Sequence, residues 1–146
     1  MTIIVDANIL ISAIINPDSF IGATLLTQNN NIDYVLPSFA IEETLYHKER
    51  ICKTLNIKEL FFEKNLDAIH NGCLVFASDS ISPKYSKVAI QIVEKIDLKD
   101  AIYVAFSLAL DALIWTGDLK LYKGLRRKNF KNIITTSDLK RILKGI

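Results

Sequence analysis

Short apolar runs that alternate with longer helical stretches are the feature that most constrains this chain. The runs that we expect to form strands are 2–5, 33–36, 73–76, 112–115 and 133–135. Strands separated by helices pair in parallel, because each return to the same edge of the sheet needs a crossover connection. The pattern predicts a three-layer α/β/α sandwich around a central, mostly parallel sheet of four to five strands. Residues 1–146 would form a single domain.

The helices expected between these strands differ in character. They cover residues 20–28, 37–55, 56–70, 85–95, 98–110 and 119–125, and Ser137 is expected to cap a last turn or two. Pro37 suits the first turn of its helix, and Asn56 with Glu59 resembles a capping pair. The stretch that Asp97 begins is apolar on nearly all sides, which indicates a helix buried in the centre of the fold.

Composition places the chain among globular proteins, since 50% of the residues are hydrophobic and 23% are charged. The N-terminal run contains an acid and no basic region, so it does not resemble a secretory signal. No apolar stretch has the roughly 20 uncharged residues of a membrane helix. Cys52 and Cys73 are far apart and match no metal-ligand spacing, as expected of free thiols in a reducing compartment. We therefore expect a cytoplasmic protein that does not enter a membrane.

The net charge of +2 hides an asymmetry along the chain. From Leu119 onward there are nine Lys and Arg residues against one acid, Asp138, whereas the preceding part has nine against fifteen. A basic segment beside an acid-rich body suits a protein that holds both a polyanion and a metal ion. A solvated lysine-rich helix face accounts for the same counts equally well.

Two acids follow predicted strands whose carboxyl ends a parallel sheet would bring close together. Asp6 ends the first strand, and Asp118 stands just past the fourth, after Gly117. In a parallel α/β sheet, ligands bind beyond the carboxyl ends of the strands. Both acids are therefore candidates for one site, although a helix N-cap for Asp6 and an ordinary Gly-Asp turn for Asp118 remain open alternatives.

Two acidic pairs on helices could join this site. Asp97 and Asp100 lie on one side of the first turn of the buried helix, where Asp97 favours a cap and Asp100 a ligand. Glu42 and Glu43 are about 100° apart around their helix, so only one of them can face the site. The sequence does not discriminate between Glu42 and Glu43.

Four acids at one edge repel each other unless a cation neutralises them or some stay protonated. Oxygen ligands favour Mg²⁺ or Mn²⁺ over zinc. No His/Cys cluster competes, because His47 and His70 are isolated in the sequence and are interpreted as surface residues. A divalent ion bound in this way would activate a water molecule and clamp a phosphate.

These motifs together resemble the PIN-domain family, close to its VapC-like toxins and its stand-alone ribonucleases. The resemblance rests on Val5–Leu10, Glu42–Glu43, Asp97–Ala101 and Ile114–Asp118, whose order and spacing cover almost the whole chain. The family's acidic helix usually has a bulky apolar residue just after its site Glu. Here Thr44 follows Glu43, which again leaves the choice between Glu42 and Glu43 open.

The resemblance implies metal-dependent endoribonuclease activity, frequent homodimers and, for many bacterial members, a small antitoxin partner. By position, it implies an acidic quartet of Asp6, Glu43, Asp100 and Asp118, of which the three aspartates would hold the metal. Asp97 would be an accessory acid, Asn8 would support Asp6, and Thr116 would orient water or phosphate. Separately, the basic residues that could grip an RNA backbone are Arg126, Arg127, Lys128 and Lys131.

Two other classes of protein stay open. The first is a non-catalytic PIN-like module that binds RNA or protein. The second is a Mg²⁺-dependent phosphatase, but an aspartyl-phosphate enzyme of that kind has a second Asp where this chain has Asn8. A dinucleotide-binding protein is disfavoured, because no GxGxxG follows the first strand. The sequence does not identify the RNA, exclude DNA as a substrate, or fix the number of metal ions.

Overall fold

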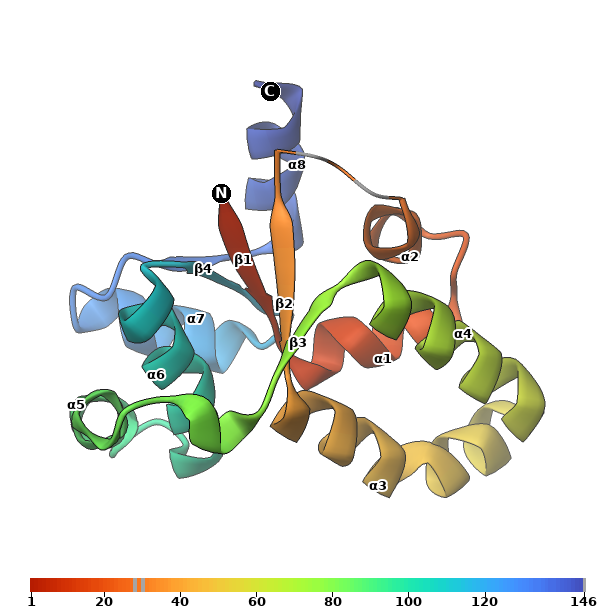
Figure 1. Cartoon of the computed structure of the whole chain (residues 1–146), viewed down its shortest axis with the longest axis horizontal. Helices are drawn as coiled ribbons and strands as arrows, with labels where there is room; N and C mark the ends of the chain where they lie inside the picture. The colour runs from red at the N-terminus through yellow and green to blue at the C-terminus, as the bar shows by residue number, and fades with distance from the viewer. Residues whose placement is uncertain (28, 30, 146) are drawn as a thin grey trace.

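A computed structural model describes residues 1–27, 29 and 31–145 of the chain. Its 5-stranded sheet has the order β3-β2-β1-β4-β5, and every pairing is parallel. The strands are β1 (Thr2–Val5), β2 (Asp33–Pro37), β3 (Leu74–Phe76), β4 (Leu113–Trp115) and β5 (Ile133–Ile134). Helices cover both faces of the sheet (Figure 1). The predicted α/β/α sandwich with a parallel sheet is therefore confirmed.

Helices connect the strands in the order that the sequence predicts. They are α1 (Ala7–Ile15), α2 (Phe20–Leu26), α3 (Ser38–Leu55), α4 (Glu59–Gly72), α5 (Pro83–Val93), α6 (Ala101–Leu110), α7 (Leu119–Arg127) and α8 (Thr136–Lys144). Short 3₁₀ turns, η1 (Ser78–Ser80) and η2 (Leu98–Asp100), precede α5 and α6. Gln28, the expected end of the 20–28 helix, lies outside the described residues.

The central strand β1 divides its side chains between two hydrophobic clusters. Ile3 and Val5 pack with α1, α2, α4 and α8 on one face. Ile4 packs with α5, α6 and α7 on the other face. Successive side chains of a strand point to opposite faces, so a β-branched strand of this kind is buried on both sides. Tyr34 and Trp115 join the first cluster, and Val35 and Ile114 join the second, in the same alternation.

Strand order reverses at β1, which positions the functional site. The chain moves from β1 outward to β2 and β3, then returns to the other side of β1 for β4 and β5. The connections that follow β1 and β4 run in opposite directions along the sheet, which opens a crevice beyond the carboxyl ends of these two strands. Asp6 is the residue after β1, and Asp118 lies three residues past the end of β4.

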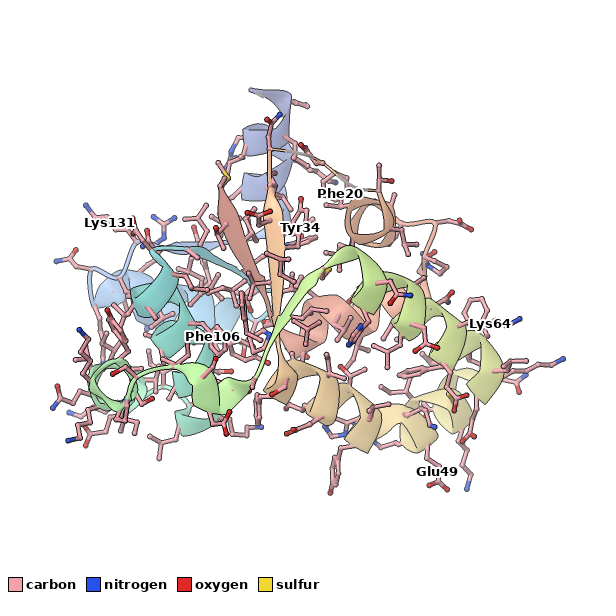
Figure 2. The ribbon with its side chains drawn as sticks, viewed as in Figure 1. Phe20, Tyr34, Glu49, Lys64, Phe106 and Lys131 are labelled. Carbon is pink, nitrogen blue, oxygen red and sulfur yellow. The ribbon has the colours of Figure 1, made fainter. Side chains whose placement is uncertain are left out.

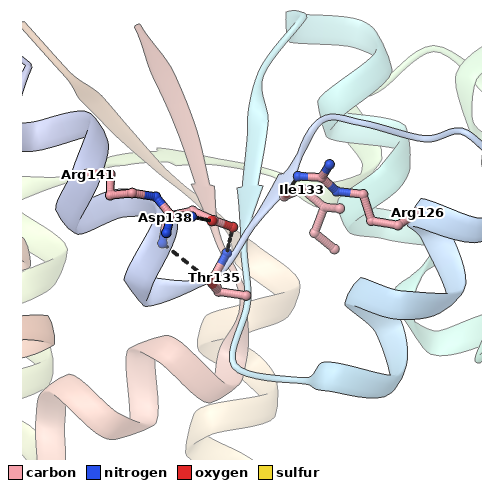
Figure 3. A network of polar contacts seen from close by, with 5 residues as sticks. All are labelled: Arg126, Ile133, Thr135, Asp138 and Arg141. Carbon is pink, nitrogen blue, oxygen red and sulfur yellow. Dashed lines mark hydrogen bonds and ion pairs between the residues drawn. The ribbon is translucent and has the colours of Figure 1, made fainter.

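Two local expectations about helices were wrong, and one helix was not expected from the sequence. The unexpected helix is α1, a nine-residue helix that is mostly buried. Asn56 is not an N-cap with Glu59; it ends α3 in the left-handed conformation, a common use of Asn, and Lys58 precedes α4. The cap of α8 is Thr135, not Ser137: Thr135 and Asp138 form a capping box, and Asp138 also pairs with Arg141 (Figure 3).

Two further expectations concern the cysteines and the membrane. Cys52 is buried, Cys73 is half-buried, and both are free thiols as expected. Among the described residues, no single helix is long and apolar enough to cross a membrane, although α1 and α2, which meet at 99°, match a bent span by length and composition.

Candidate active site

Asp6 is buried at the end of β1, with 4% of its surface exposed. It caps α1 by accepting a hydrogen bond from the Ile9 backbone N–H at 2.9 Å. Its other carboxylate oxygen accepts a bond from the Thr116 hydroxyl at 2.5 Å. The N-cap alternative for Asp6 thus holds, and it does not exclude a role in the site, because each oxygen keeps lone pairs free.

Asp118 is tied to Asp6 through Thr116. The Thr116 hydroxyl that donates to Asp6 also accepts a bond from the Asp118 backbone N–H at 3.0 Å. Asp118 itself caps α7, accepting from Lys120 at 2.9 Å and Leu121 at 3.2 Å with the same oxygen. Since β4 pairs directly with β1, this chain of bonds fixes the two carboxylates at one edge of the sheet.

Asp97 and Asp100 approach the same place from η2. Asp97 caps this turn by accepting from the Lys99 N–H at 3.1 Å, whereas the Asp100 side chain makes no cap bond. Both acids line the hollow that contains Asp6. The separate roles expected for them, cap and ligand candidate, fit this difference.

Glu43, and not Glu42, faces the hollow. Glu43 is half-buried and lines it, while Glu42 is exposed and does not. Thr44, the residue that departs from the family pattern, is fully buried and donates its hydroxyl proton to the Ala40 carbonyl at 2.8 Å. The polar residue is therefore satisfied inside the helix, and it does not disturb the position of Glu43 at the hollow.

The four carboxylates of Asp6, Glu43, Asp100 and Asp118 line one hollow of about 230 Å³. Burial raises the pKa of Asp6 from 3.8 to about 6; the bonds from Thr116 and Ile9 oppose this rise, and the charges of Asp118 and Glu43 add to it. Burial raises the pKa of Asp100 to about 7, with a further contribution from Asp97 and the other acids. The pKa values of both carboxyl groups are thus raised by burial and by the negative charges crowded around them.

The hollow also contains side chains that the sequence analysis did not select. Tyr103 is buried, and its hydroxyl accepts a bond from the Ala7 N–H at 3.1 Å, directly after Asp6. His47 is half-buried at the surface and lines the hollow, so it lies beside these acids in space although it is isolated from them in the sequence; His70 is exposed as expected. Lys99 adds a cation. Helical spacing could have indicated the first two, since Tyr103 is three residues after Asp100 and His47 four after Glu43.

The donor set fits a hydrated divalent cation. All four carboxylates offer oxygen, which Mg²⁺ and Mn²⁺ prefer. Within the described part of the chain, no group of three or more His, Cys, Asp or Glu side chains is arranged to hold an ion directly. Mg²⁺ usually keeps several waters and binds through one or two carboxylates. The residues therefore suit an ion held partly through water.

Of the remaining predicted residues, Asn8 lies at the hollow and the basic set does not. Asn8 is exposed and lines it beside Asp6. The basic residues Arg126, Arg127, Lys128 and Lys131 are exposed around the C-terminal end of α7. That end is about 13 Å along the helix from Asp118, and Arg126 there donates to the Ile133 carbonyl at 3.3 Å (Figure 3).

A doubly wound parallel sheet with carboxylates gathered at its switch point defines a class of acidic-site α/β domains. The sequence matches the PIN domain family over residues 4–138, and the chain belongs to that family. PIN domains are generally nucleases and typically use a divalent metal ion. No curated protein matches the sequence.

Among solved structures, this chain is similar in fold to a protein chain in the "Crystal structure of VapBC2 from Rickettsia felis bound to a DNA fragment from their promoter". The TM-score is 0.68 at 17% sequence identity, and the match covers 92% of this chain and 97% of that chain. At this identity, the similarity shows the shared fold.

Proposed function

We propose that this protein is a Mg²⁺- or Mn²⁺-dependent endoribonuclease. The observation that carries the proposal is the meeting of Asp6, Glu43, Asp100 and Asp118, from four separate segments, around one hollow. Acidic side chains are seldom gathered in a partly buried place unless the site has a function, such as binding a cation that offsets their repulsion. Membership of the PIN domain family supports phosphodiester hydrolysis as that function.

Each side chain would have a distinct role. Asp6, Asp100 and Asp118 would hold the metal, directly or through water, and Glu43 would complete the shell or accept a proton from the attacking water. Thr116 keeps the Asp6 carboxylate oriented through its hydroxyl, and Tyr103 fixes the backbone next to it. A bound divalent ion supplies an activated water and neutralises charge that develops on the phosphate.

The test is a cleavage assay on labelled single-stranded RNA with MgCl₂, with MnCl₂ and with EDTA. Wild type should cut with metal only, and Asp6→Asn should lose at least about a hundredfold in rate, a typical cost of removing one electrostatic element. Asp67→Asn, an exposed substitution on α4, is the matched control. Equal rates for wild type and Asp6→Asn would remove Asp6 from the mechanism.

The assay also separates the alternative functions. A non-catalytic PIN-like module would show neither cleavage nor heat on titration with Mn²⁺. A small-molecule phosphatase would release inorganic phosphate from phosphomonoesters and leave RNA intact. Parallel assays on DNA of the same sequence would define the substrate class.

We further propose that the nuclease is the toxin of a toxin–antitoxin pair. The similarity in fold to a chain of the VapBC2 complex supports this proposal. A small DNA-binding protein encoded beside this gene, which co-purifies with the chain and suppresses cleavage, would be the expected partner. A homodimer stays a prediction, which light scattering of the purified protein would test.

A further inference from the structure

One face of α3 continues outward from the acidic hollow. A second, shallow hollow of about 560 Å³ lies along this helix, lined by Tyr46, His47, Glu49, Arg50 and Lys53. His47 also lines the acidic hollow. The two hollows therefore adjoin at His47, and a chain-like ligand in the first has a path into the second.

Helix geometry aligns the side chains of this path. With 100° per residue, Lys53, Tyr46, Arg50, Glu43 and His47 fall within an arc of about 120°. From Glu43 to Lys53 the helix rises about 15 Å. We call the outer part, formed by Tyr46, Arg50 and Lys53, the α3 strip. Along this face of α3, the side-chain charge is negative at Glu43 and positive at Arg50 and Lys53 in the strip.

The cations of the α3 strip are available to a ligand. In the part of the chain that the structure describes, the ion pairs are Lys48–Glu63 and Arg141–Asp138, and neither includes Arg50 or Lys53. Glu49 is the acid on this surface; it is exposed and points from α3 away from the body of the protein (Figure 2). The strip thus keeps a positive balance beside the acidic hollow.

Arg50 and Tyr46 are both positioned by His47. The Arg50 guanidinium lies 3.0 Å from His47 Nδ1, and because Arg has only donors, the imidazole accepts this bond. The Tyr46 ring packs edge-on against the imidazole, with centroids 5.0 Å apart and planes at 79°. Tyr46 is 83% exposed, so the face of this ring is open to a planar partner. An exposed aromatic ring beside cations is the usual composition of a single-strand binding surface.

We propose that the α3 strip binds the RNA strand next to the scissile phosphate, with a base stacked on Tyr46 and phosphates on Arg50 and Lys53. The proposal rests on the proposed nuclease function, and charge complementarity selects the occupant: the strip is cationic and aromatic, as a polyanion with flat bases requires. It assigns backbone contacts to α3 instead of to Arg127, at the end of α7, and Lys131. Figure 2 shows Lys131 on the far side of the molecule from Glu49 of α3.

Binding of a short fluorescein-labelled single-stranded RNA, followed by anisotropy, tests the α3 strip. The measurement is made with CaCl₂ and repeated in EDTA, so it does not depend on hydrolysis. The variants are Arg50→Ala/Lys53→Ala and Tyr46→Ala, with Tyr46→Phe to keep the ring. Arg127→Ala/Lys131→Ala is the charge-matched control, since both residues are exposed and removed from the hollow.

We expect the Arg50→Ala/Lys53→Ala protein to bind about tenfold more weakly. The slope of log K against log salt concentration should fall by about 1.4, or 0.7 for each lost phosphate contact. Tyr46→Ala should weaken binding about tenfold, and Tyr46→Phe should bind as wild type does. The control should keep its affinity within about twofold.

Equal affinity of wild type and the strip variants, or a larger loss in the control than in Arg50→Ala/Lys53→Ala, would overturn the proposal. The proposal would also be overturned if wild type bound no RNA in either buffer. That result would hold even if the strip bound a protein partner instead. Loss of binding in the strip variants supports the α3 strip whether or not RNA is cut. The cleavage assay on wild type reports separately on the nuclease proposal.

Discussion

Asp6 is predicted to destabilise the metal-free protein, so its replacement by Asn should increase stability. Asn keeps an oxygen that accepts the Ile9 N–H, so the cap of α1 is preserved. What is lost is a buried negative charge. Since burial raises the pKa of Asp6 from 3.8 to about 6, its ionised form costs roughly 3 kcal/mol above pH 7. Allowing for the weaker bond to Thr116, we expect Asp6→Asn to gain about 1–3 kcal/mol in EDTA at pH 8.

The pH dependence has a definite sign. Because the folded protein holds the Asp6 proton more tightly than the unfolded chain, wild type loses stability as pH rises from about 4 to about 6. Asp6→Asn has no such titration. Its advantage should therefore shrink by about 1.4 kcal/mol at pH 5, and Asp100, which titrates in both proteins, should largely cancel in the comparison.

Urea unfolding at pH 5 and pH 8 in EDTA, repeated at pH 8 with MnCl₂, measures these differences. Mn²⁺ should reverse the order, because an ion at about 1,000 times its Kd stabilises wild type by about 4.1 kcal/mol and Asp6→Asn much less. Asp67→Asn, exposed on α4, should change stability by less than about 0.5 kcal/mol throughout. A loss of stability in Asp6→Asn that is equal at both pH values would refute the reasoning.

Three further predictions test single contacts. Tyr103→Phe leaves the buried Ala7 N–H without its acceptor and should cost about 1–3 kcal/mol in urea unfolding; an unchanged midpoint would show that the bond is dispensable. Glu43→Gln should lower kcat for RNA cleavage at least tenfold, whereas Glu42→Gln, exposed beside the hollow, should cleave as wild type does; the reverse order would move the site to Glu42. Gly22→Ala should cost more than about 2 kcal/mol, because its Cβ would lie 2.5 Å from a backbone oxygen in the preceding turn; a soluble variant of wild-type Tm would contradict this contact.

The sheet was predictable because its strands are short, separate apolar runs, and all but the edge strand β3 are mostly buried on both faces. The helix α1 was not, since Ala7–Ile15 is rich in isoleucine and apolar on nearly every side. Its two polar residues, Asn8 and Ser12, are four positions apart on one exposed face. This signal is too short to outweigh the β propensity of the isoleucines, and burial against the sheet decides the conformation. The caps predicted at Asn56 and Ser137 were wrong for another reason. Several residues near a helix end can cap it, and the tertiary contacts select one.

The candidate site was predictable where a residue follows a strand. Asp6 and Asp118 could be placed together because parallel neighbours end at one edge. The choice between Glu42 and Glu43 depends on which face of α3 points toward the hollow. The sequence does not fix this orientation, because it shows no contact between α3 and the sheet. Helical spacing from Asp100 could place Tyr103 on the side of α6 that faces the site, but its bond to Ala7 joins residues 96 positions apart and is not encoded locally.

Anomalous diffraction from crystals soaked in MnCl₂ tests most directly whether these acids share a metal ion. A manganese peak within coordination distance, directly or through water, of Asp6, Asp100 and Asp118 is the predicted result, and it should vanish in Asp6→Asn crystals. Manganese bound elsewhere on the protein with none at this hollow would contradict the account.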